Sequence, residues 1–547
     1  MMRLFSFIII VMVVDALAFA TEWYAAPSGT NYCKGVGSFI DPWDVHTVLW
    51  NTVYTNQTSH PIQPGDTVWL RGGTYIGHSQ TINTTNMFTT WLSGLEGRPL
   101  SGTEAQPIIL RSYLDEIPIF DGVFSVDNTN CWFWGLHITL SDDPMPLDLT
   151  REEQDTAVDD GLYRKGRLDV PSGLNLKFIN CVIYDTYASS SIGGVGTEIY
   201  GCLLLYNGRF ASDLPSGHGF YINKSQSPGT IVDNCVFANN FLNGLNLYGA
   251  TGAGSLNNLK CINNVLFGNG TFVDTGTYNL LAGVEGGVSN IVLGSNISRG
   301  KSGLDPNSQQ ANLYLGYGGC LVVNPVVTNN ILLYGGLSIK SNISGIVTNN
   351  RVYSYYGINF WGWGDLSDAD WDHNTYQSTY STPFVRYLPE LNVNFATWQE
   401  YTSMEVNSTF GTSLPTVSEI IVQTNSYESD RANIIVINWG NSNNIPVNLS
   451  NTGLQANQRY ELRVAQNYHT DVIYGTYTEV PIIIPMTNWG VRQPRSLILA
   501  MADETWKAAH PTISNIASTF PDFGVFILNG INSIVPTVRH SRWKSPE

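Results

Sequence analysis

A phrase that recurs through the middle of the chain constrains its fold more than any other feature. Between residues 174 and 371, β-branched or aromatic runs follow an Asn or a substitute, as in FINCVIYDT, VDNCVFANN and VTNNILLYGG. The positions after that Asn are 181, 202, 235, 264, 296, 330, 350 and 374. Repeats of roughly 20–35 residues are typical of a solenoid, whose units bury their apolar faces by stacking on one another. Because the runs lack helical periodicity, they predict a right-handed parallel β-helix.

A second set of repeats lies between the first and indicates which side chains face the core. In GFYIN, GLNLYG, NLLAG, NLYLG, GLSIK and GINFW, alternate positions are apolar. Successive side chains of a strand point to opposite faces, so these positions predict one buried row. Its members are Phe220, Ile222, Leu245, Leu247, Leu280, Ala282, Leu313, Leu315, Leu337, Ile339, Ile358 and Phe360.

The positions between the buried ones predict an outward face that can hold a carbohydrate. Aromatic rings can pack against sugar rings, and amides and amines can bond to hydroxyl groups. The predicted substrate-binding residues are Asn246, Tyr248, Tyr314, Lys340 and Trp361.

The N-terminal residues indicate export. Residues 1–20, MMRLFSFIIIVMVVDALAFA, combine an Arg, an apolar run and an Ala-Phe-Ala cleavage pattern, as in a secretory signal peptide. A retained anchor is the alternative, although the run is short for a bilayer span. We therefore expect a secreted protein, with the periplasm or cell surface as alternatives, and no membrane span after cleavage.

The rest of the chain predicts two domains. Residues 21–410 are assigned to the β-helix, with an N-terminal cap and a C-terminal capping helix in NFATWQEYTSM that begins after Asn394. A linker is predicted over 411–429. Short alternating strands without the coil repeat then predict a small antiparallel β-sandwich over 430–530, and 531–547 a flexible tail. The predicted fold class is all-β.

The charge of the chain limits its partners. A formal net charge of -17 argues against nucleic acid, which needs clustered Lys and Arg. An acidic polysaccharide would need a local group of cations or a bridging Ca²⁺, the one cofactor considered. The acidic segment 141–167 lacks EF-hand spacing and is interpreted as a solvated loop, so no metal ligand is assigned. We expect a monomer.

The cysteines predict an internal ladder of thiols. Cys181, Cys202 and Cys235 occupy the same repeat position, so they should stack in successive coils. The pair considered for a disulfide is Cys33 with Cys131, because an exported protein permits such bonds.

Two phrases near the start resemble a known superfamily. PGDTVWLRGGTY followed by GTEAQPIILRSY is similar to the opening coils of secreted right-handed β-helix proteins, which include pectate-lyase-like polysaccharide lyases, glycoside hydrolases and epimerases. SGHGFYIN, NGLNLYG, NNVLFGNG and NLYLGYGG resemble a bacterial subgroup whose chemistry is poorly defined. The resemblance covers about residues 24–530 and implies the fold, but it carries over no catalytic residue.

The segment NGRFASDLPSGHGFYINKS holds the densest group of side chains that can transfer protons. A β-eliminating lyase needs a base, a cation that neutralises the uronate carboxylate, and an acid for the leaving oxygen. His218 or Tyr221 is predicted as base or acid, and Arg209 as the neutralising cation. The alternative is structural: His218 caps a turn and Tyr221 is a stacking or surface residue.

Two other functions stay open. A glycoside hydrolase needs two carboxyl groups that flank the bond, for which Asp169, Asp213, Asp233 and Glu285 are candidates. A non-catalytic solenoid would only bind glycan or act as a surface spacer. The leading hypothesis is a lyase that acts on a uronate-containing polysaccharide, with Asp169 included in its predicted site.

Overall fold

The computed structural model describes residues 20–29, 36–50, 61–76, 78–79, 86–89, 100–142, 145–159, 162–213, 215–223, 225–249, 255–272, 277–284, 286–300, 311–340, 344–354, 358–361, 368–386 and 391–531. The predicted signal peptide and the predicted tail lie outside these residues except at their inner ends. No helix within the described ranges is long and apolar enough to span a membrane.

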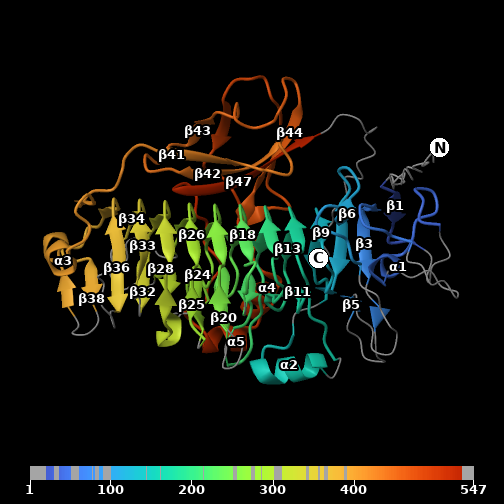
Figure 1. The fold of residues 1–547 in the computed structure, drawn as a ribbon, viewed down its shortest axis with the longest axis horizontal. Helices are drawn as coiled ribbons and strands as arrows, with labels where there is room; N and C mark the ends of the chain where they lie inside the picture. Colours follow the sequence, from blue (N-terminus) through green and yellow to red (C-terminus); the bar gives the residue numbers. More distant parts are fainter. Residues whose placement is uncertain are drawn as a thin grey trace, which may run out of the picture.

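Three long sheets build the solenoid, and each coil passes through them in the order A, B, C (Figure 1). Sheet A contains β1 (Glu22–Ala25), β2 (Thr67–Leu70), β6 (Ile108–Ser112), β9 (Cys131–Trp134), β12 (Lys177–Ile179), β15 (Glu198–Tyr200), β18 (Ile231–Asp233), β22 (Lys260–Ile262), β26 (Val292–Gly294), β30 (Val326–Thr328), β33 (Ser344–Thr348) and β36 (Asp368–Asp372). Sheet B contains β3 (Gly73–Ile76), β7 (Pro118–Asp121), β10 (His137–Thr139), β13 (Val182–Tyr184), β16 (Leu203–Leu205), β19 (Val236–Ala238), β23 (Val265–Phe267), β27 (Ile297–Arg299), β31 (Ile331–Leu333), β34 (Arg351–Tyr353), β37 (Thr375–Gln377) and β40 (Thr409–Gly411).

Sheet C is parallel except for an antiparallel pair at each end. It contains β4 (His78–Ser79), β5 (Asn86–Thr89), β8 (Val123–Ser125), β11 (Arg167–Val170), β14 (Ser190–Ile192), β17 (Phe220–Ile222), β20 (Leu245–Gly249), β24 (Leu280–Val284), β28 (Ala311–Leu315), β32 (Gly336–Lys340), β35 (Ile358–Trp361), β38 (Phe384–Arg386) and β39 (Leu391–Val393). Three short strands form a fourth sheet between C and A: β21 (Leu256–Asn257), β25 (Val288–Ser289) and β29 (Val322–Val323). The molecule is thus a right-handed parallel β-helix, as the repeat predicted.

The repeat marks the turn between sheets A and B. Val182 pairs with Leu203, and the same register continues along sheet B, so all eight repeat positions align. The residue before each position has positive φ, for example 53° at Asn180 and 55° at Asn234. Asn tolerates this left-handed conformation better than most residues, which explains why it recurs.

The predicted inward row is buried in the described coils. All ten of its members from Phe220 to Ile339 are at most 1% exposed. The side chains of the remaining two, Ile358 and Phe360, lie outside the described part. Cys181, Cys202 and Cys235 are buried free thiols, as the ladder predicted. The disulfide considered for Cys131 is wrong, because this residue is also a buried free thiol; Cys33 lies outside the described residues.

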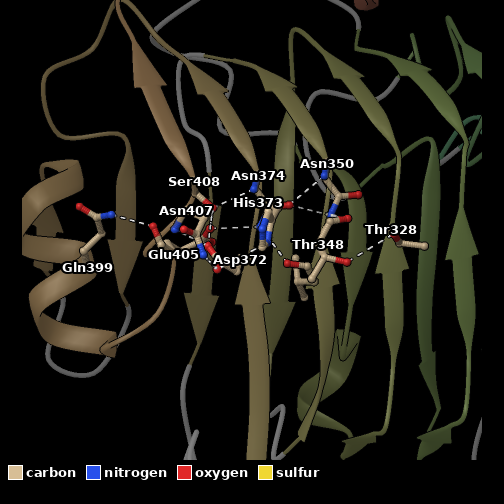
Figure 2. A network of polar contacts seen from close by, with 11 residues as sticks. Thr328, Thr348, Asn350, Asp372, His373, Asn374, Gln399, Glu405, Asn407 and Ser408 are labelled. Carbon is tan, nitrogen blue, oxygen red and sulfur yellow. Dashed lines mark hydrogen bonds and ion pairs between the residues drawn. The ribbon is translucent and has the colours of Figure 1, made fainter.

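Buried asparagines link the coils. Asn330 illustrates the pattern: its Oδ1 accepts from Asn296 Nδ2 at 2.9 Å, and its own Nδ2 donates to Asn350 Oδ1 at 2.9 Å. The ladder ends at Asn374, whose Nδ2 donates to the buried carboxylate of Glu405 at 3.1 Å (Figure 2). Each amide satisfies backbone groups of neighbouring coils, which would otherwise be buried without partners.

Helices close the two ends of the solenoid. Helix α1 (Val45–Trp50) lies at the N-terminal end and α3 (Phe395–Thr402) at the C-terminal end (Figure 1). Asn394 Oδ1 accepts from the backbone N–H of Thr397 at 2.9 Å, so it is the predicted N-cap. Trp371 and Trp398, both buried, stack at the end of the core.

The C-terminal part is a small antiparallel sandwich. One sheet contains β41 (Glu419–Thr424), β42 (Arg431–Ile437), β47 (Phe523–Ile531), β44 (Arg459–Val464) and β45 (Val472–Thr476), and the other β43 (Asn444–Val447) and β46 (Ile482–Pro485). Strand β41 lies inside the segment predicted as a linker, so the sheet begins at 419 rather than 430. Helices α4 (Arg495–Ala502) and α5 (Glu504–Ala509) were not predicted.

The sandwich packs on the outward face of sheet B. Apolar side chains from both domains form one buried cluster, which includes Leu205, Phe267 and Leu333 of the solenoid and Val525 and Ile527 of the sandwich. The sandwich therefore runs along one side of the solenoid, while α2 (Arg151–Asp159) projects on the opposite side (Figure 1).

Helix α2 occupies part of the segment predicted as a loop over 141–167. Its Gln154, Ala157 and Val158 are buried, so the helix docks by one face. One acidic residue outside the helix also has a partner, since Asp142 pairs with Arg164. The described part of the segment thus includes a docked helix between sheets B and C, so it is not only a solvated loop.

Candidate functional site

The outward row of sheet C brings several predicted site residues into register. Asp169 pairs with Ser191, Ser191 with Tyr221, and Tyr221 with Asn246. Neighbouring strands lie about 4.8 Å apart, so Asp169 and Tyr221 are separated by about 10 Å across the serine. This row is the floor of the candidate site.

His218 stands at the edge of this floor in a neutral state. Its Nδ1 accepts from the backbone N–H of Asn243 at 3.0 Å, and the backbone N–H of His218 donates to Ser189 Oγ at 2.9 Å. Burial lowers the pKa of His218 to about 3. Since Nδ1 is occupied as an acceptor, the proton of the neutral ring belongs on Nε2. His218 is thus arranged to donate a hydrogen bond and is poorly placed to take a proton.

Asn246 and Tyr221 differ in what they offer a ligand. Asn246 is buried, its Oδ1 accepts from Asn243 Nδ2 at 2.9 Å, and its amide lies 3.4 Å from His218 Nε2. Its Oδ1 is therefore already occupied within the protein. Tyr221 is partly exposed, and burial raises the pKa of its hydroxyl. The phenol stays protonated and can donate to an oxygen above the sheet.

Arg209 does not belong to this face, which corrects its predicted role as the neutralising cation. Its side chain is 2% exposed, and each of its three guanidinium nitrogens donates a hydrogen bond. It donates to Gln154 Oε1 at 2.7 Å, to the carbonyl of Tyr187 at 2.5 Å, and to Asp155 Oδ1 at 2.6 Å. Arg209 instead fastens helix α2 to the solenoid.

Two cations that the sequence analysis missed lie beside the row. Arg151 begins α2, and its charge contributes to the lowered pKa of His218. Lys165 precedes β11; burial lowers its pKa, and the charge of Arg167 acts in the same direction. In the described part of the chain neither side chain has a hydrogen-bond or ion-pair partner. No spacing in the sequence marked them, because the α2 insertion brings them to sheet C.

Carboxyl groups are scarce on the same face. Asp169 is the only Asp or Glu in the described strands of sheet C, and Arg167 Nη2 lies 3.0 Å from its Oδ2. Asp213 accepts from the backbone N–H of Arg151 at 2.7 Å, at the start of α2. Asp233 lies on sheet A, and Glu285 lies outside the described residues. The strands thus present one carboxylate, not the pair that a hydrolase needs.

An aromatic cluster continues the face beyond Asn246. The rings of Tyr278 and Tyr314 are 4.7 Å apart, Tyr314 and Tyr317 are 5.8 Å apart, and Tyr248 and Tyr317 are 5.9 Å apart. Tyr248 and Tyr314 were predicted as substrate-binding residues, whereas Tyr278 and Tyr317 were missed because they precede or follow the strands. Four partly exposed rings suit stacking against sugars.

The two remaining residues predicted to bind substrate are Lys340 and Trp361. Lys340 is partly exposed on β32 and has a further interaction of its own. Trp361 ends β35, but its side chain lies outside the described part. Within the described ranges no group of three or more His, Cys, Asp or Glu could hold a metal ion. A role for Ca²⁺ stays a prediction.

No family model and no curated protein sequence matches this chain. Among solved structures, pectate lyase Pel9A aligns over 72% of this chain and 79% of its own, at 15% identity and a TM-score of 0.39. A rhamnogalacturonan lyase aligns over 72% and 87% respectively, at 15% identity and a TM-score of 0.35.

A third structure is a mannuronic acid specific family 6 lyase from human gut microbiota. It aligns over 72% of this chain and 88% of its own, at 13% identity and a TM-score of 0.33. The fold itself is decided by the three parallel sheets. The chain is a parallel β-helix protein.

Proposed function

We propose that sheet C binds a uronate-containing polysaccharide and that the protein cleaves it by β-elimination. The observation that carries this proposal is the position of Arg151 and Lys165. In a chain of net charge -17, these two cations have no ion-pair partner in the described part and lie beside His218 and Arg167. A local group of cations is what an acidic polymer requires on an acidic protein.

Each step of the reaction has a side chain suited to it. Lys165 is the proposed base, because its lowered pKa increases the share of neutral amine. It takes the proton next to the uronate carboxylate, and the electron pair forms a carbon–carbon double bond as the glycosidic carbon–oxygen bond breaks. Tyr221 donates a proton to the leaving oxygen, and Arg151 neutralises the carboxylate in the transition state.

Binding is shared by the remaining residues of the face. His218 donates from Nε2 to a sugar oxygen, and the backbone N–H of Asn243 holds its ring. The tyrosine cluster around Tyr314 provides stacking for sugars further along the same face. Glycoside hydrolysis is not proposed, because Asp169 has no second carboxylate on the described strands.

The experiment that tests this function follows two signals of cleavage together. Purified protein is incubated with polygalacturonate, alginate and a neutral glucan, with Ca²⁺ or with a chelator. The ultraviolet absorbance of unsaturated uronate and the number of reducing ends are followed together. We expect both to rise with an acidic polymer, and to be lost in Lys165→Met, Tyr221→Phe and Arg151→Met.

The control variant is Lys260→Met, which changes an exposed lysine on sheet A and should keep full activity. Reducing ends without absorbance would replace elimination by hydrolysis. Binding to an acidic polymer without either product would reduce the function to glycan binding. Full activity in Lys165→Met would overturn the assignment of the base.

A further inference from the structure

A row of aromatic and basic side chains lies on the outward face of sheet A, near the N-terminal end. Trp69 pairs with Arg111, and Arg111 pairs with Trp134 on the next strand. Tyr113 follows the same strand as Arg111, and Trp132 occupies the adjacent outward position on β9. We call these five residues the sheet A strip.

Arg111 is held between two indole rings. Its guanidinium carbon lies 5.1 Å from the ring centre of Trp69 and 4.1 Å from that of Trp134. Contacts of this kind stabilise a cation and fix the plane of the guanidinium. The Nε of Arg111 is enclosed without an acceptor, and its terminal nitrogens make no hydrogen bond to any described residue either. These nitrogens are not among the enclosed atoms, so they remain reachable from solvent.

The neighbouring cations are already neutralised, which distinguishes Arg111 from them. Arg71 lies 2.8 Å from the carboxylate of Glu116, and Lys177 lies 2.7 Å from that of Glu198. The carboxylate whose charge acts on Arg111 is that of Glu428. It accepts a hydrogen bond from the indole N–H of Trp134 at 2.6 Å. The terminal nitrogens of Arg111 can therefore still donate hydrogen bonds to an anion.

Both domains build the rims of the strip. At one end Phe39, which is 47% exposed, packs 5.6 Å from Tyr113. At the other end Tyr427, from the turn between β41 and β42, packs 5.9 Å from Trp132. Trp69, Tyr113 and Trp132 are themselves partly exposed. The rings therefore frame Arg111 instead of covering it.

We propose that the sheet A strip is a second polysaccharide-binding site, which holds a sugar bearing a carboxylate. The carboxylate accepts two hydrogen bonds from the terminal nitrogens of Arg111 in the forked arrangement that arginine favours. The apolar face of the same or the next sugar packs on Trp69 or Trp132. This inference rests on the proposed function, because both concern an acidic polysaccharide. The residues of the strip are different from those proposed for cleavage on sheet C.

The chemistry of the strip favours an acidic glycan over nucleic acid. Nucleic acid affinity comes from many phosphate contacts, whereas Arg111 is the one cation of this surface without a carboxylate partner in the described part. The net charge of -17 opposes a densely charged polymer in general. A second site on another face would keep a long substrate near sheet C by raising its effective concentration.

The test is electrophoresis of the full chain in native gels that contain polygalacturonate, a neutral glucan or single-stranded DNA. We expect polygalacturonate alone to retard the protein. In Arg111→Leu the dissociation constant obtained from retardation should rise at least about tenfold, the loss of one charge-assisted pair. Cleavage of short soluble oligogalacturonates should be unchanged in this variant.

The proposed function and the strip can fail separately. Lys165→Met should lose cleavage and keep retardation, whereas Arg111→Leu should do the opposite. Arg459→Leu, which changes an exposed arginine on β44, is the matched control and should behave as wild type. If Arg111→Leu melts early, Arg111→Lys keeps the charge without the fork and should still bind more weakly.

Three results would overturn the strip as an acidic-sugar site. They are equal retardation of wild type and Arg111→Leu, equal retardation by neutral glucan, and retardation by single-stranded DNA alone.

Discussion

The Nδ1 of His218 accepts a hydrogen bond from the backbone N–H of Asn243 at 3.0 Å. This contact assigns the ring proton to Nε2 and ties the ring to the next coil of the solenoid. The residue that stood out most in the sequence as a proton acceptor is therefore a fixed donor. Two histidines outside the site, His137 and His469, are also buried in the neutral state. The three together make the stability of the protein depend on pH.

The first prediction is that acid destabilises the protein before its carboxylates titrate. Burial lowers the pKa of His137 to about 3, of His218 to about 3 and of His469 to about 2. In the unfolded chain each titrates near about 6.5, so the unfolded state binds more protons below that pH. Stability should be fully present above about pH 6.5 and fall by about 1.4 kcal/mol per pH unit for each histidine.

Urea unfolding between neutral and mildly acidic pH measures this effect. A free energy of unfolding that stays constant between about pH 7 and pH 5 would contradict it. Proton NMR of the His218 ring should show the Nε2–H tautomer throughout the same range.

The second prediction separates Arg209 from Arg151. Arg209→Met leaves Gln154 Oε1 and the carbonyl of Tyr187 without their donor, so the free energy of unfolding should drop by about 2–4 kcal/mol. Arg151→Met should leave the melting temperature unchanged, because its side chain has no hydrogen bond in the described part. A stable Arg209→Met that had lost only substrate affinity would return Arg209 to the site.

The third prediction concerns the buried asparagine ladder. Asn330→Ala removes bonds to Asn296 and Asn350 and leaves their amide atoms unpaired in the core. The expected loss is about 2–4 kcal/mol in the free energy of unfolding. Asn324→Gly is the matched control, since Asn324 is exposed and glycine tolerates its positive φ. Its cost should stay below about 1 kcal/mol, and equal costs would refute the role of the ladder.

The fourth prediction assigns Tyr278 to substrate binding. Its ring lies 4.7 Å from that of Tyr314 on the face of sheet C. Tyr278→Ala should raise KM about two- to tenfold and leave kcat nearly unchanged, since an aromatic contact contributes about 0.5–1.5 kcal/mol. Tyr474→Ala, in an exposed position of the C-terminal sheet, should have no effect. A fall in kcat alone would place Tyr278 in the chemical step.

The fifth prediction is that the solenoid needs its C-terminal domain. A chain that ends at Gly411 exposes the apolar outward face of sheet B, including Leu205, Phe267 and Leu333. Exposed apolar patches of this kind promote association. We expect this chain to aggregate in size-exclusion chromatography and to bind a hydrophobic dye. A soluble monomer with the wild-type melting temperature would show that the sandwich is dispensable.

The solenoid was readable from the sequence because its physical constraints repeat. Every coil needs inward apolar residues at alternate positions, as at Leu245 and Leu247, and a residue that tolerates positive φ at the same turn, as at Asn234. Stacking in register turns these local needs into a regular pattern. The C-terminal strands were readable for a similar reason, since their alternation is local to each strand.

The site was readable only in part. Asp169, Tyr221 and Asn246 were placed correctly on one outward row because strand parity and register follow from the repeat. Arg209 was assigned the wrong role, because its partners Gln154 and Asp155 come from an insertion more than fifty positions away. No local pattern tells a buried, paired arginine from an exposed one.

The sequence by itself determined the coil, its buried row and the residues that face outward, since these depend on strand alternation and turn conformation within each repeat. Only the tertiary structure decided which charges are free. Arg209 bonds to residues of α2, and the same insertion places Lys165 and Arg151 beside sheet C. Arg111 lies between two tryptophan rings. Whether a charge is solvated, paired or buried depends on neighbours distant in the chain, and these are set by how insertions and domains pack.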